Sequence, residues 1–128
     1  MNKRRVDSWL LKAREGLMLA GVVEDGTVDR TYRAQIVSFG AAVLMTTLPA
    51  AVTFFAGQGN ASVNRSRLLQ AMYYCISGEL LPEKEIASRV CENDSNSLRE
   101  QFIDASVAVK LAMNFFELVQ RGGSSEES

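Results

Sequence analysis

The sequence contains no histidine, only two cysteines and only two prolines among 128 residues. Without histidine, the chain can form neither a Ser-His-Asp triad, nor a Cys-His pair, nor a histidine-ligated metal site. Cys75 and Cys91 do not form a CxxC motif, so a zinc site made of thiolates is also excluded. We expect no cofactor and no enzymatic activity. Two free cysteines and the lack of a signal peptide lead us to expect a reducing, cytoplasmic setting.

Length and composition are those of one globular domain. Apolar residues recur at helical spacing along most of the chain, and no alternating strand pattern of useful length is found. Helices are expected over residues 2–20, 29–48, 49–56, 63–77, 82–91 and 98–120. The sequence therefore predicts an all-α fold, a compact bundle of five or six helices, with one domain over residues 1–121. The polar tail 122–128 is expected to be disordered.

Several residues mark where these helices begin and end. Asp25-Gly26 forms the tip of a predicted turn at residues 21–28. Pro49 lacks an amide donor and should kink or break the second helix, while Gly78 ends the third. Ser97 and Glu100 have the spacing of a capping box at the start of the last helix.

Charge is distributed unevenly along the chain. Residues 1–70 carry nine basic and five acidic residues, for a net charge of +4, whereas residues 71–128 carry a net charge of −5. Such a dipolar chain could contact an acidic partner such as RNA with its basic part, or both parts could simply be solvated. Tyr32, between Arg30 and Arg33, could stack on a base, or it could pack on the first helix. The sequence leaves both alternatives open.

The segment between Ala34 and Asn64 contains no charged residue. Residues 36–54 are long and apolar enough to raise the question of a membrane span. Pro49, the threonines and the many alanines favour a core helix instead. The carboxylates of the second half lie in charge-mixed stretches, and we interpret them as a solvated acidic face.

Apolar residues also occur away from the expected core. Leu11 and Met18 lie on the side of the first helix that faces away from its apolar stripe. The last predicted helix has a second apolar face, nearly opposite the first. These positions predict a contact with a partner chain, although scatter would explain Leu11 and Met18 as well. The candidate partner-interface residues are Leu11, Met18, Val107, Leu111, Phe115 and Leu118.

Two stretches are similar to a known family. They are Tyr32–Leu44 (YRAQIVSFGAAVL) and Leu48–Phe55 (LPAAVTFF), and the opening MNKRRV, Trp9 and the run RSRLL at Arg65–Leu69 also fit. Over residues 1–76 the chain resembles the small subunit of the type III-B CRISPR effector, the fifth subunit of the Cmr complex. Met45-Thr46-Thr47 departs from the Gln-Ser-Gly that is common there.

This resemblance implies an all-α, non-catalytic protein whose copies stack into a minor filament inside a ribonucleoprotein. Its expected partners are the subunit that holds the guide RNA, other Cmr subunits, copies of itself, guide RNA and target RNA, but no membrane. A channel for RNA needs basic residues that meet phosphates without reading bases. The candidate RNA-binding residues are Lys3, Arg4, Arg5, Lys12, Arg30, Tyr32, Arg33, Arg65 and Arg67. The alternative is a helical adaptor that binds protein only.

Overall fold

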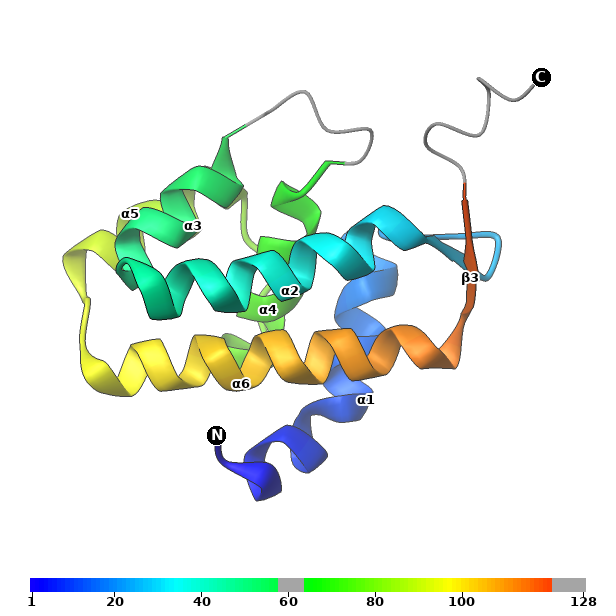
Figure 1. The fold of residues 1–128 in the computed structure, drawn as a ribbon, viewed down its shortest axis with the longest axis horizontal. Coiled ribbons are helices and arrows are strands. Elements are labelled where there is room, and N and C mark those ends of the chain that lie inside the picture. The colour runs from blue at the N-terminus through cyan, green and yellow to red at the C-terminus, as the bar shows by residue number, and fades with distance from the viewer. Residues whose placement is uncertain (58–63, 121–128) are drawn as a thin grey trace.

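The computed structural model describes residues 1–57 and 64–120. In these ranges six α-helices follow one another, with three very short strands and a 3-10 turn (Figure 1). The elements are α1 (Lys3–Leu19), β1 (Val23–Glu24), β2 (Thr27–Asp29), α2 (Arg30–Met45), α3 (Leu48–Ala56), α4 (Ser66–Ser77), α5 (Glu83–Glu92), α6 (Asn96–Ala112), η1 (Met113–Phe115) and β3 (Glu117–Val119). The predicted all-α bundle is confirmed.

The helices pack around one apolar core. α2 and α6 lie side by side across the front of Figure 1, and α1 packs against both α6 and α4. Phe39 of α2 is at the centre, with its ring centroid 5.1 Å from that of Phe55 and 6.1 Å from that of Phe102. All three rings are buried. The apolar stripes of helices that are far apart in sequence therefore cover one another.

Helix ends follow local capping chemistry. The Asp29 carboxylate accepts a hydrogen bond from the Thr31 amide, and Gly78 ends α4 in the left-handed region at φ 77°. The predicted break near Pro49 is confirmed, because α2 ends at Met45 and α3 begins at Leu48. The capping residue of α6 was predicted wrongly: the Ser95 hydroxyl, not that of Ser97, accepts from the Leu98 amide at 3.0 Å.

The end of the last predicted helix is also wrong. α6 stops at Ala112, and residues 117–119 form β3, which pairs with β2 in parallel register with Leu118 opposite Val28. β1 and β2 form an antiparallel hairpin whose tip is Asp25 (φ 54°) and Gly26 (φ 75°). Strand β2 of the hairpin pairs with the backbone of residues 117–119, and the helical spacing of apolar residues cannot show this pairing. These residues therefore form a strand and not a helix, while Phe116 and Leu118 still pack against the core.

In residues 1–57 and 64–120, no helix has both the length and the hydropathy needed to cross a bilayer. Ile36, Phe39, Val43, Leu48 and Val52 of the uncharged segment are buried in the core. The start of the third predicted helix at residue 63 and the tail 122–128 lie outside the described residues.

Candidate nucleic-acid interface

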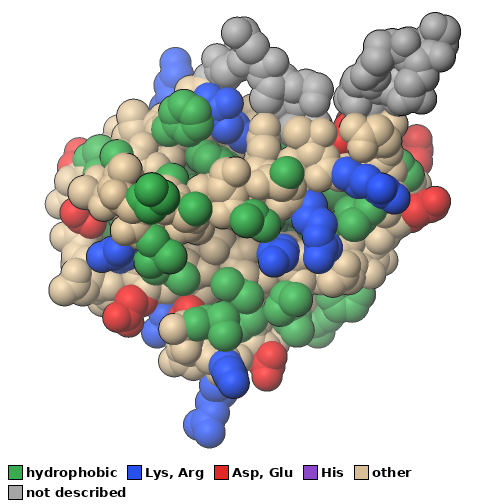
Figure 2. Space-filling model, viewed as in Figure 1, with side chains coloured by type: hydrophobic (Ala, Val, Ile, Leu, Met, Phe, Trp, Pro, Cys, Tyr) green, Lys and Arg blue, Asp and Glu red, His purple; other side chains and the backbone are tan. Residues whose placement is uncertain are grey.

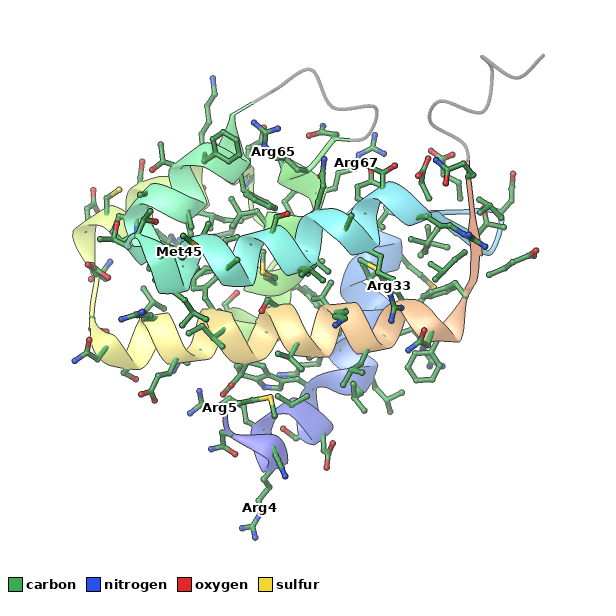
Figure 3. The ribbon with its side chains drawn as sticks, viewed as in Figure 1. Arg4, Arg5, Arg33, Met45, Arg65 and Arg67 are labelled. Carbon is green, nitrogen blue, oxygen red and sulfur yellow. The ribbon has the colours of Figure 1, made fainter. Side chains whose placement is uncertain are left out.

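The predicted basic residues separate into groups in the fold. Figure 3 shows Arg65 and Arg67 along one edge, at the start of α4, and Arg33 on the face formed by α2 and α6. Arg4 and Arg5 lie at the start of α1, away from that edge. Lys3, Arg4, Lys12 and Arg30 are exposed. The candidates therefore do not form one continuous surface.

Arg65 is held against the end of α3. Its Nε donates a hydrogen bond to the carbonyl of Phe54 at 3.2 Å, and its guanidinium carbon lies 4.3 Å from the centroid of the Phe54 ring. The last carbonyls of a helix lack intrahelical donors and carry partial negative charge. Arg65 thus caps α3 while it opens α4.

Arg67 and Arg33 are also held by neutral acceptors. Arg67 Nη1 donates to the carbonyl of Gly21 at 3.0 Å, and Arg33 Nη1 donates to Oδ1 of Asn114 at 3.1 Å. Within the described ranges, neither residue forms an ion pair, and neither does Arg65. Moreover, the sequence from Arg30 to Gly78 contains no Asp or Glu. In the described part of the chain, the hydrogen bonds that hold Arg33, Arg65 and Arg67 go to neutral acceptors.

The placement of the cations runs against the usual helix preference. α1, α2 and α4 have no acidic residue in their first turns, although Asp29 caps α2. Instead, basic residues occupy the starts of these helices: Lys3, Arg4 and Arg5 in α1, Arg30 and Arg33 in α2, and Arg65 and Arg67 around the start of α4. The partial positive charge of a helix N-terminus makes a cation there unfavourable and an anion favourable. α5 shows the ordinary arrangement, with Glu83 and Glu85 in its first turn.

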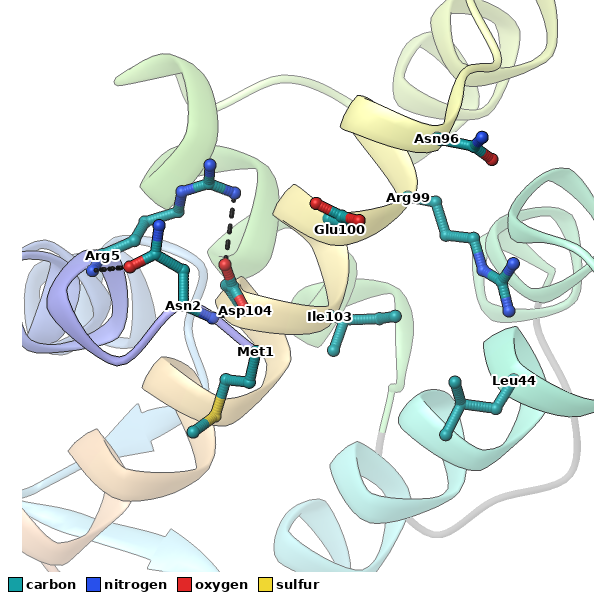
Figure 4. A pocket seen from close by; sticks show the side chains of 9 residues that line it. All are labelled: Met1, Asn2, Arg5, Leu44, Asn96, Arg99, Glu100, Ile103 and Asp104. Carbon is teal, nitrogen blue, oxygen red and sulfur yellow. Dashed lines mark hydrogen bonds and ion pairs between the residues drawn. The ribbon is translucent and has the colours of Figure 1, made fainter.

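Arg5 differs from the other candidates because a carboxylate takes up its charge. Its Nη1 lies 3.2 Å from Oδ2 of Asp104, which is 1% exposed and also accepts from the Asn2 amide. The pair lines one side of a pocket of about 680 Å³ (Figure 4). Arg99 and Glu100 also line it, so the lining includes two guanidinium groups and two carboxylates. This pocket has no excess of positive charge, and we leave Arg5 out of the interface.

Tyr32 was placed wrongly among the RNA-binding candidates. The residue is 3% exposed and belongs to the buried core. Its position on α2 puts it in line with Ile36, Phe39 and Val43, which are also buried. A base therefore cannot stack on it in this structure.

The partner-interface candidates are brought together only in part. Leu11 (63% exposed) and Met18 (48%) of α1 flank Arg14, whose guanidinium carbon lies 5.1 Å from the Phe115 ring centroid. Leu111 and Phe115 are 43% and 51% exposed. Figure 2 shows apolar side chains gathered along α6 on the viewed face. We call Leu11, Met18, Leu111 and Phe115 the apolar face. Val107 and Leu118 instead are half-buried and pack against the core, Leu118 because β3 turns it inward.

Sequence reasoning missed Leu44, Met45 and Phe54, which are 65%, 82% and 64% exposed. The uncharged run that contains them was interpreted as core, and only three-dimensional packing separates its buried residues from its exposed ones.

Among the thiols, burial raises the pKa of Cys75 to about 12, against a smaller lowering by Lys12. In the described part of the chain, no three potential metal ligands come together.

Comparison with known proteins adds no relative: no family model, no curated protein and no solved structure matches this chain.

Proposed function

We propose that the chain is a non-catalytic structural subunit of a type III-B (Cmr) CRISPR ribonucleoprotein in the cytoplasm, lining the channel for guide and target RNA. In this proposal, copies of the chain stack beside the backbone subunits. Arg30, Arg33, Arg65 and Arg67 contact RNA phosphates without reading bases. The resemblance over residues 1–76 is the reason for proposing a Cmr complex. The positive charges at the first turns of α2 and α4 support the proposed RNA contact.

The placement of these cations is the observation that carries the proposal. A cation at a helix N-terminus costs roughly 0.3–1 kcal/mol of stability at an exposed site. Two helices, α2 and α4, carry two such cations each, and Arg33, Arg65 and Arg67 donate hydrogen bonds to neutral acceptors. A phosphate at these positions would meet guanidinium donors and a helix dipole of the same sign. The charges of Arg65 and Arg67 are offset in part by carbonyls at the ends of α3 and α1, whereas an anionic partner would make the placement of Arg30 and Arg33 more favourable.

The apolar face supports the protein contacts of such a subunit. Its four large side chains are between 43% and 63% exposed, although the three elements that carry them, α1, α6 and η1, pack against one another. Large apolar side chains exposed on neighbouring elements are typical of protein interfaces. The same observation favours the second candidate function, a helical adaptor that binds protein without RNA.

The decisive experiment purifies the tagged protein from its native host and measures retained RNA over a range of salt concentrations. We expect guide RNAs with a shared repeat-derived 5′ end and the backbone subunits to co-purify. Arg33→Gln and Arg65→Gln together should lower the slope of log K against log[salt] by about 1.4–1.8, because each lost phosphate contact removes about 0.7–0.9.

The matched control is Lys84→Gln, which removes a cation from an exposed position beside Glu83 and Glu85 in α5. It should leave the slope unchanged, and all variants should keep the melting temperature within a few degrees. An unchanged slope in the double variant contradicts the RNA contact. Protein partners without guide RNA would favour the adaptor.

A further inference from the structure

Phe54 is an exposed aromatic ring at the end of α3. The residue is 64% exposed, while its neighbour Phe55, with a ring centroid 6.2 Å away, is 3% exposed and belongs to the core. The chain thus anchors one phenylalanine inside the bundle and leaves the next ring largely open to solvent. A ring in this position is available to a planar ligand.

The Arg65 side chain is held beside the ring by contacts with Phe54 itself. The Phe54 carbonyl accepts hydrogen bonds from the Gly57 amide at 3.2 Å and from Arg65 Nε at 3.2 Å, while the Arg65 guanidinium lies over the ring at 4.3 Å. Ring and carbonyl of one residue therefore hold the same guanidinium. Because these contacts already place the guanidinium beside the ring, a ligand would not have to position it.

Among the described residues, the groups near the ring are cationic and polar. The exposed described residues nearest to Phe54 in the chain are Ala50, Thr53, Gly57 and Asn64, and none of these is a large apolar residue. Figure 3 shows Arg67 on the same edge as Arg65, and Met45, another exposed apolar residue, lies away from it. A protein hot spot sits inside an apolar patch that excludes water. A single ring beside guanidinium groups instead matches the stacking sites of proteins that bind single-stranded nucleic acids.

We propose that Phe54 and Arg65 form a stacking site for an unpaired RNA base. The base would lie on the open part of the Phe54 ring, and Arg65 and Arg67 would meet the adjoining phosphates. This inference rests on the proposed RNA contact and extends it, since phosphate contacts alone need no aromatic group. It also supplies the aromatic partner that the buried Tyr32 cannot be.

The test compares two probes at low salt, about 50 mM, where phosphate contacts are strong. One is an oligoadenylate RNA of about 12 nucleotides, and the other is a strand of equal length whose ribose-phosphate backbone carries no bases. Phe54→Leu should weaken binding of oligoadenylate by about tenfold, within the range measured for loss of one stacked base, and leave the abasic strand unchanged. Phe54→Tyr, which keeps a ring, should bind both probes like the natural protein.

Arg33→Gln is the control for the phosphate contact and should weaken binding of both probes alike. If Phe54→Leu changes neither probe, or both equally, while Arg33→Gln weakens both, the stacking site is wrong and the phosphate contact stands. If Phe54→Leu instead releases a co-purifying protein and leaves both probes unaffected, the ring is a protein contact. If the natural protein binds neither probe, the RNA contact fails as well. Because Phe54 is exposed, its replacement should not disturb the fold. The melting temperature of each variant checks this.

Discussion

At Gly16 the helix α1 packs closely against α4, and replacing this glycine by alanine tests the packing directly. Gly16 is buried in α1 against α4. A Cβ there would lie 3.2 Å from the Ala71 carbonyl oxygen, 3.3 Å from the Ala71 Cα and 3.3 Å from Cδ2 of Tyr74. Two of these three atoms are backbone, so the contact can relax only if α1 and α4 move apart. The glycine therefore sets the distance between the two helices.

Two effects of opposite sign decide the outcome. Alanine stabilises a helix interior by about 0.5–1 kcal/mol relative to glycine. An added methyl group in a packed core costs about 1–3 kcal/mol. We expect Gly16→Ala to lower the free energy of unfolding by about 0.5–2 kcal/mol. Gly40→Ala is the matched control in α2, because the nearest atom to its Cβ is Ser106 Oγ at 3.8 Å. It should stabilise by about 0.5–1 kcal/mol.

Thermal unfolding followed by circular dichroism distinguishes the two variants. At roughly 4 °C per kcal/mol for a chain of this length, Gly16→Ala should lower the melting temperature by about 2–8 °C and Gly40→Ala should raise it by about 2–4 °C. A melting temperature that rises equally in both variants would refute the close contact between α1 and α4.

Two further predictions concern a thiol and a helix cap. Burial raises the pKa of Cys75 from about 9 to about 12, so the unfolded chain releases this proton first and stability should fall as pH rises above 9, by about 1.4 kcal/mol per pH unit up to about 12. In urea titrations at high pH, Cys75→Ala should lack this part of the slope; an identical slope would show that the thiol does not titrate differently on unfolding. Ser95→Ala should cost about 1 kcal/mol because Ser95 caps α6, whereas Ser97→Ala should cost little. Equal melting temperatures of the two variants would contradict the assigned cap.

Helix positions were predictable because their causes are local. The spacing of apolar residues predicts α1, and the side chains of Asp29 and Thr47 accept hydrogen bonds from amides in the first turns of α2 and α3. The break near Pro49 follows from its missing amide hydrogen. Such signals depend on residues a few positions apart, and they survive in any tertiary context.

The end of α6 could not be predicted in the same way. Phe115 and Leu118 continue a helical pattern, yet the backbone of residues 117–119 pairs with β2, which lies far away in the sequence. The spacing of apolar residues is compatible with a helix here, but a strand that packs on the core also needs apolar residues. The pattern alone therefore cannot distinguish the two. Only the position of the hairpin decides between helix and strand.

For the candidate RNA contact, too, some features follow from the sequence and others only from the tertiary structure. The sequence by itself determined the basic helix starts and the absence of carboxylates from Arg30 to Gly78, since these are properties of composition along the chain. The tertiary structure alone decided that Tyr32 is buried, that Asp104 neutralises Arg5, and that Phe54 is exposed under the guanidinium of Arg65. Burial and charge pairing depend on which elements meet in space, and residues 99 positions apart in the sequence, as Arg5 and Asp104 are, meet only after the chain has folded.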